Sequence, residues 1–200
     1  MIKGLPVVLA ETGKIKIGRK GKEKISSSGK RFQMPEKLDH FIVTTTERGE
    51  DGNFIIDKDI MGKLGPSPKE IPVFLPFDDL EANFVTSLKY YHGKTALCFG
   101  DNETAKRIKK DGSIEEVKCD FNTCPYFKQK KCKMTGTLSV IPAVAEVLGG
   151  VYKYRTTSWH SICKTLASLC FLQSITGGRL AGLRLKMKLL SGTAEIDGSE

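Results

Sequence analysis

The segment TAKRIKKDGSIEEVKCDFNTCPYFKQKKCK, residues 104–133, joins a hairpin pattern to a cluster of cysteines. Two short runs, 104–109 and 114–118, flank Asp111-Gly112, a dipeptide that favours the tight turn of a β-hairpin. The second run leads directly into three cysteines: Cys119, Cys124 and Cys132. We therefore expect an antiparallel hairpin followed by a short loop that carries three thiols.

Three thiols within fourteen residues, with Pro125 fixing the backbone after the second, are typical of a metal-binding knuckle. The nearest further thiol is Cys98, at the end of a short apolar run that predicts a strand. The predicted ligands are therefore Cys98, Cys119, Cys124 and Cys132. Four thiolates favour one structural zinc ion, and the spacing leaves an iron–sulfur cluster open as the alternative. A disulfide or unpaired thiols would be the plainer interpretation.

The other two cysteines, Cys163 and Cys170, are seven residues apart on one face of an expected helix, so we expect them in the core. The apolar run at the start of the chain is too short for a secretory signal, which predicts a reducing, cytoplasmic compartment. No apolar stretch approaches the roughly 20 residues that a membrane span needs.

The charge is strongly basic: 32 Lys and Arg against 23 Asp and Glu give a net charge of +9. The excess gathers in residues 1–33, around the cysteines, and near residues 179–188. Such clusters favour contact with a polyanion, although a lysine-rich solvent surface would look the same. The candidate nucleic-acid or partner contacts, with two aromatic residues for base stacking, are Lys14, Lys16, Arg19, Lys20, Lys22, Lys24, Tyr126, Phe127, Lys128, Lys130, Lys131, Arg184, Lys186 and Lys188.

The predicted organisation is a basic N-terminal arm or loop (1–33), one domain (34–190) with the zinc knuckle within 98–132, and a flexible tail (191–200). The Gly-, Ser- and Lys-rich segment 14–31 is the mobile part of the arm. Ser158 is expected to cap a helix over about 158–172, and a short helix is expected over 57–64. Strands are expected at 41–46, 71–75 (an edge strand), 84–91, 95–99, 136–141, 150–155 and 180–190. The class is α+β with a mainly antiparallel sheet.

Several ordered phrases over roughly residues 14–190 resemble one family, the phage recombination directionality factors. The phrases are 35–45, 71–78, 98–102 with Ala105 and Arg107, 124–125 with 132–133, 136–138, and 150–152 with 157–158. The resemblance implies an accessory protein that partners a large serine integrase in actinophages and switches it from integration to excision. It also implies a metal-binding protein, encoded by a phage or prophage and acting in the bacterial cytoplasm. Asn102 stands where the resemblance leads us to expect glycine.

An enzyme is not expected. Asp78, Asp79 and Asp101 could serve a nuclease, but adjacent aspartates on a strand point apart and more often lie in turns. No nucleophile motif accompanies a histidine, and no phosphate-binding glycine loop is present. The expected function is therefore binding, with DNA and a serine integrase as partners and no membrane or small-molecule substrate. The alternative is a non-catalytic, zinc-containing single-stranded DNA-binding protein of phage replication or recombination.

Overall fold

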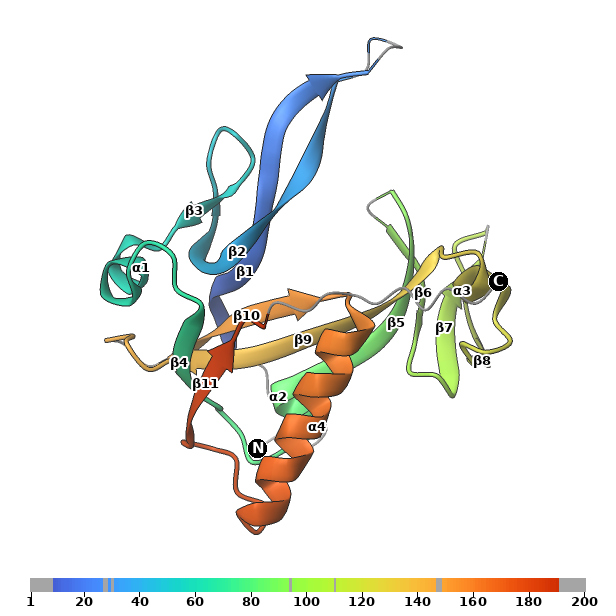
Figure 1. The fold of residues 1–200 in the computed structure, drawn as a ribbon. Helices are drawn as coiled ribbons and strands as arrows, with labels where there is room; N and C mark the ends of the chain where they lie inside the picture. Colours follow the sequence, from blue (N-terminus) through green and yellow to red (C-terminus); the bar gives the residue numbers. More distant parts are fainter. Residues whose placement is uncertain are drawn as a thin grey trace, which may run out of the picture. The chain divides into compact units, whose positions relative to one another are not determined.

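The computed structural model describes residues 9–26, 29, 31–93, 95–109, 111–146 and 149–190. The predicted tail, 191–200, lies outside these residues. The described residues are mainly β: eleven strands with mostly antiparallel pairing accompany one long helix and three short ones. The elements run β1 Ala10–Ile25, β2 Arg31–Arg48, β3 Phe54–Ile56, α1 Lys58–Leu64, β4 Glu70–Phe74, α2 Leu80–Asn83, β5 Phe84–His92, β6 Thr95–Gly100, β7 Thr104–Ile108, β8 Ile114–Lys118, α3 Pro125–Lys128, β9 Cys132–Pro142, β10 Gly150–Thr156, α4 Trp159–Ile175 and β11 Arg184–Lys188 (Figure 1).

The chain folds into two compact units. Among the described residues, the first contains those within 9–74, 140–152 and 184–190, and the second contains those within 75–139 and 153–183. Strands β9 and β10 each contribute residues to both units. The predicted boundaries of arm, domain and tail stay predictions.

The first unit is built on a long antiparallel ribbon of β1 and β2 (Figure 1). The pairing runs from Gly13 opposite Thr45 to Ile25 opposite Arg31, with two irregularities: extra residues on β2 between Lys16 and Gly18, and one extra residue on β1 between Lys20 and Glu23. Most described residues of the segment 14–31 are strand, so the prediction of a loop there is wrong, while the prediction of a basic arm stays a prediction. Glycine and lysine are poor strand formers, but the cross-strand partners and the burial of Ile15, which is 1% exposed, outweigh that local preference.

The core of the first unit includes residues of the ribbon and of β4 and β10: Ile15, Phe41, Val43, Ile71 and Val151 are buried. Asp57 begins α1 by accepting a hydrogen bond from Ile60 N, and Gly65 ends it, as predicted. The Asp57 carboxylate also accepts a hydrogen bond from the Tyr152 hydroxyl at 2.7 Å. Strand β4 pairs with β11 on one side and with the end of β9 on the other, so the prediction of an edge strand is wrong.

The second unit holds the strands β9, β5, β6, β7 and β8 as consecutive antiparallel neighbours. The hairpin predicted around Asp111-Gly112 is confirmed, and the strands expected at 84–91 and 95–99 form a second one. His92 and Thr95 close the β5–β6 pair, and Ile108 and Ile114 close the β7–β8 pair around Asp111-Gly112. Gly112 has φ +83°, the left-handed conformation that this turn requires.

Helix α4 begins at the predicted cap, because Ser158 Oγ accepts a hydrogen bond from Ser161 N, and it continues to Ile175. Ile162 and Leu169 are its buried side chains. Cys163 and Cys170 are exposed, so the prediction that they lie in the core is wrong. The helix carries apolar residues around most of its circumference, and their spacing alone does not identify the buried face.

Gly136 on β9 lets α4 come close to the sheet. A Cβ atom built at Gly136 would lie 2.8 Å from Phe84 Cζ and 3.0 Å from Ile162 Cγ1, both on buried side chains. A side chain here would push the helix and the sheet apart.

Gly136→Ala should therefore lower the free energy of unfolding by about 1–3 kcal/mol, because overpacking of a filled core costs about that much. The control is Gly62→Ala in α1, where an added Cβ meets nothing within 4 Å. That change should stabilise by roughly 0.5–1 kcal/mol, since alanine is the better helix former. Denaturant unfolding of both variants checks the pair, and equal effects would contradict this account of Gly136.

Candidate functional site

The register of the second unit brings two cysteines together around one tyrosine. Tyr90 on β5 is directly opposite Cys132 on β9 and Cys98 on β6. Cys98 is in turn opposite Arg107 on β7. Directly opposed residues of antiparallel strands project to the same face of the sheet. Cys132, Tyr90, Cys98 and Arg107 therefore form one row across four strands.

The loop between β8 and β9 adds the other two predicted thiols. Cys119 N donates a hydrogen bond to Glu103 O, and Cys124 N donates to Asp120 O, which fixes the start of α3. Cys119 comes so close to Gly100 that a Cβ there would lie 2.7 Å from Sγ. All four thiols consequently line one cavity, the cysteine cavity, together with Leu88, Tyr90, Gly100, Ala105, Arg107, Lys118 and Tyr126.

The four thiols are gathered but not arranged as a metal-binding group. Within the described part of the chain, no three His, Cys, Asp or Glu side chains meet closely enough to hold a metal ion. In the described residues, the four predicted cysteines therefore line a cavity and do not form a metal-binding cluster. Burial is the main cause that raises the pKa of the Cys132 thiol to about 11, and the other three thiols add to it. Burial likewise raises the pKa of Cys119.

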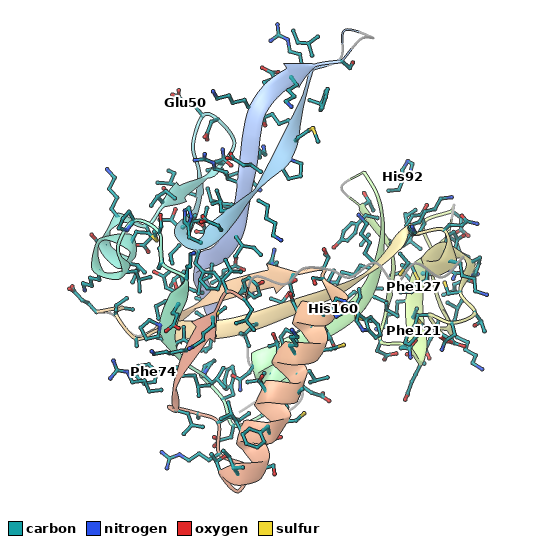
Figure 2. The ribbon with its side chains drawn as sticks, in the orientation of Figure 1. Glu50, Phe74, His92, Phe121, Phe127 and His160 are labelled. Atoms are coloured by element: carbon teal, nitrogen blue, oxygen red, sulfur yellow. The ribbon has the colours of Figure 1, made fainter. Side chains whose placement is uncertain are left out.

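Aromatic and guanidinium groups pack beside the cysteine cavity. Tyr126 stacks on Tyr90 with ring centroids 4.9 Å apart, and the Arg107 guanidinium lies 5.2 Å from the Tyr126 ring centroid. Phe127 contacts Phe121, at 5.7 Å between centroids (Figure 2). Both rings predicted to stack on bases are therefore half-buried in contacts within the protein. Among the described residues, Arg107 Nε is the buried side-chain polar atom without a hydrogen-bond partner.

Asn102 occupies the position at which the family resemblance led us to expect glycine. Its φ is +86°, in the left-handed region that glycine adopts most easily and asparagine tolerates. Its side-chain oxygen accepts a hydrogen bond from Phe121 N at 2.9 Å. Asparagine therefore keeps the turn and also holds the start of the cysteine loop, which glycine could not do.

The three aspartates considered for a nuclease each accept hydrogen bonds from backbone amides. Asp78 Oδ1 accepts hydrogen bonds from Leu180 N and Ala181 N, each at 2.8 Å, and these bonds lower the pKa of Asp78. Asp79 caps α2 by accepting from Glu81 N. Asp101 accepts from Glu103 N and Thr104 N in the turn before β7.

The candidate lysines of the second unit lie on the surface: Lys128, Lys130 and Lys131 are all exposed. The candidates of β11 alternate with half-buried residues, as predicted. However, Lys186 and Lys188 both pair with Glu70 on β4, at 3.1 and 2.9 Å. Two predicted contacts are thus partly neutralised by an acidic residue that is distant in the sequence.

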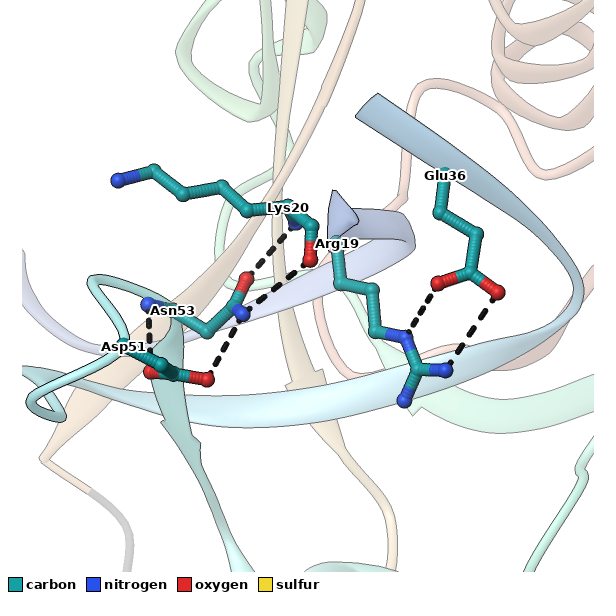
Figure 3. A network of polar contacts seen from close by, with 5 residues as sticks. All are labelled: Arg19, Lys20, Glu36, Asp51 and Asn53. Carbon is teal, nitrogen blue, oxygen red and sulfur yellow. Dashed lines mark hydrogen bonds and ion pairs between the residues drawn. The ribbon is translucent and has the colours of Figure 1, made fainter. Parts of the chain in front are cut away.

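The ribbon carries the remaining candidates. Lys14 pairs with Glu11, and Arg19 pairs with Glu36 at 2.8 Å. The Asn53 side chain accepts a hydrogen bond from Lys20 N at 2.8 Å and donates to Lys20 O, so the turn before β3 is held against β1 (Figure 3). Lys22 and Lys24 are exposed further along β1.

Two residues beside these candidates escaped sequence reasoning. Arg48 ends β2 and Phe54 begins β3, and both lie beside Lys14 and Lys16. Arg48 had no basic neighbour in the sequence, and Phe54 had no pattern that distinguished it from a core residue. Arg48 and Phe54 lie beside the lysines of β1 because the strands β1, β2 and β3 pair with one another.

A comparison with family models matches residues 12–200 to the Gp3-like family, described as recombination directionality factor-like. The chain belongs to this family. The resemblance found in the sequence is confirmed over nearly the whole chain. Comparisons with curated proteins and with solved structures gave no match. No helix among the described residues of this Gp3-like chain is long and apolar enough to cross a membrane.

Thiol labelling tests the two cysteine environments. At pH 8 the native protein should react quickly at the exposed Cys163 and Cys170 and slowly at Cys132, because a raised pKa leaves little thiolate and burial limits access. The measurement is the absorbance of a disulfide reagent such as Ellman's reagent. Cys163→Ala with Cys170→Ala should remove the fast phase. A fast phase that survives this change would contradict the described exposures.

Proposed function

We propose that this Gp3-like chain is a recombination directionality factor that binds a serine integrase on DNA and promotes excision over integration. The family match over residues 12–200 is the observation that carries the proposal. The charge of +9 supports a place beside DNA. The protein would act in the bacterial cytoplasm, encoded by a phage or prophage.

The protein would act without chemistry of its own. The aspartates that could have served a nuclease instead accept backbone hydrogen bonds: Asp78 from residues 180–181, Asp79 at a helix cap and Asp101 in a turn. Strand exchange would belong to the integrase. A binding protein shifts an equilibrium only by its different affinities for two assemblies. A coupling free energy of about 1–3 kcal/mol corresponds to roughly a 5- to 150-fold change in that equilibrium.

The test mixes a cognate integrase with attL and attR DNA, with and without this protein. Excision product should form only when the protein is present, since integrase alone favours the other direction. The control is the same integrase on attP and attB, where the protein should give no gain. An attL and attR reaction that is unaffected by the protein would contradict the proposal.

Single-stranded DNA binding, the alternative function, has less support. Its best stacking candidates were Tyr126 and Phe127, and both rings are engaged within the protein. Base stacking needs an accessible ring face. The alternative stays a prediction that a single-stranded oligonucleotide would test.

We also propose that Cys98, Cys119, Cys124 and Cys132 bind one structural zinc ion. The donor set suits zinc, and its four thiols line one cavity. Binding would deprotonate the thiols, draw them into a tetrahedral group and contribute folding free energy. The nearby Arg107 guanidinium would offset part of the negative charge of four thiolates.

Elemental analysis of protein purified without chelator should therefore find about one zinc per chain. Cys124→Ser should lower that content and the melting temperature, because structural zinc stabilises the folded state directly. The matched control is Cys163→Ser, at an exposed thiol outside the cysteine cavity. Metal-free protein would refute the zinc site, and iron with a visible absorption band would indicate a cluster instead.

A further inference from the structure

Three cations of the first unit surround one aromatic ring, a group that we call the Phe54 cluster. Lys14 Nζ and Lys16 Nζ lie 4.7 and 5.0 Å from the centroid of the Phe54 ring. Arg48 Cζ lies 4.1 Å from the same centroid. The residues come from three adjacent strands, β1, β2 and β3, and Arg48 is directly opposite Phe54 in the β2–β3 pair. The negative face of an aromatic ring attracts each cation and fixes its position.

The cluster holds like charges close together with little compensation. Burial lowers the pKa of Lys16, and the positive charges of Arg48, Lys14 and Lys20 lower it further. Glu11 pairs with Lys14, and Asp51 lies beside Lys20 through Asn53. Neither Lys16 nor Arg48 forms an ion pair with a carboxylate among the described residues; Arg48 donates to Gly52 O at 2.7 Å. A bound anion would relieve this repulsion.

Positive charge continues from the cluster along the ribbon. Beyond Lys16, the exposed basic residues Arg19, Lys20, Lys22, Lys24, Arg31 and Lys37 are accompanied by the acidic residues Glu23, Glu36 and Asp39. A strand rises about 3.4 Å per residue, so the ten steps from Lys14 to Lys24 cover at most about 34 Å. One turn of duplex DNA has nearly the same length, about 34–36 Å.

We propose that the Phe54 cluster and the β1–β2 ribbon form a duplex DNA-binding surface in which Lys16 and Arg48 contact backbone phosphates. The inference rests on the proposed function in placing the protein beside DNA, and it gives the protein a DNA contact that does not pass through the integrase. Arg48 and Phe54 become part of the interface. Asn53 is a positioning residue, because its two hydrogen bonds to Lys20 hold the turn before β3 against β1.

Duplex DNA fits this surface better than a single strand does. A single-strand groove needs aromatic faces on which bases can stack. The cations occupy the space around Phe54, and in the described part of the ribbon Phe32 is the one exposed ring. A two-stranded ribbon, by contrast, has dimensions that the major groove of duplex DNA admits. Charge along a hydrogen-bonded ribbon suits phosphates that are already held in a regular array.

Fluorescence anisotropy of a labelled duplex of about 25 base pairs, with this protein alone and no integrase, tests the surface. Lys16→Gln with Arg48→Gln should weaken binding at least tenfold in low salt. The slope of log affinity against log salt should become shallower by about 1.8, because two phosphate contacts are lost. Phe54→Leu should weaken binding roughly two- to fivefold, since leucine keeps an apolar side chain at this position but removes the cation–π attraction to the lysines and Arg48.

The matched control is Lys186→Gln with Lys188→Gln, which removes the same number of charges from the same unit at lysines that are both paired with Glu70. This pair should leave the salt slope unchanged. Melting temperatures check that all variants fold. Equal losses in both pairs, tighter binding to a single strand of the same length, or no duplex binding by the wild type would overturn the inference. The excision assay would then still decide the proposed function independently, since its readout needs only the integrase contact.

Discussion

Cross-strand pairing is the constraint on which both candidate sites depend. An antiparallel register decides which residues stand opposite each other and on which face they project. In the second unit it sets Cys132 and Cys98 on either side of Tyr90. In the first unit it sets Arg48 against Phe54, beside the lysines of β1. A slip of one residue would turn these side chains to the opposite face and dismantle both groups.

Features written in short stretches of sequence could be predicted. The Asp111-Gly112 turn, the Asp57 and Ser158 caps and the alternation over 184–188 each depend on neighbours within a few residues. Strand β1 could not be predicted in this way, since its glycines and lysines are stabilised by β2. The exposure of Cys163 and Cys170 was missed for a related reason: α4 is apolar on more than one face, and the sheet selects which face is buried.

The candidate sites were predictable to different degrees. Four cysteines could be grouped because three are close in sequence and their chemistry is distinctive. The charged surface could not, because a lysine count does not show which charges are compensated. Glu70 pairs with Lys186 and Lys188 across more than a hundred residues of chain, whereas Lys16 has no such partner among the described residues.

Uncompensated charge identifies an interface better than total charge does. A lysine paired with a carboxylate must lose that partner before it can bind a phosphate, so part of the new attraction is cancelled. Among the residues that the structure describes, Lys16 and Arg48 have no such pair to break, and Phe54 already restrains them, which reduces the entropy that binding would cost. The same reasoning separates the two units. The ribbon holds cations where an anion lowers repulsion, while the cysteine cavity holds thiols where a cation would do so after deprotonation. Each group carries a charge that the described neighbouring side chains do not fully balance: positive in the Phe54 cluster, and negative in the cysteine cavity once its thiols are deprotonated. The sign of that charge indicates whether an anion or a cation would bind there.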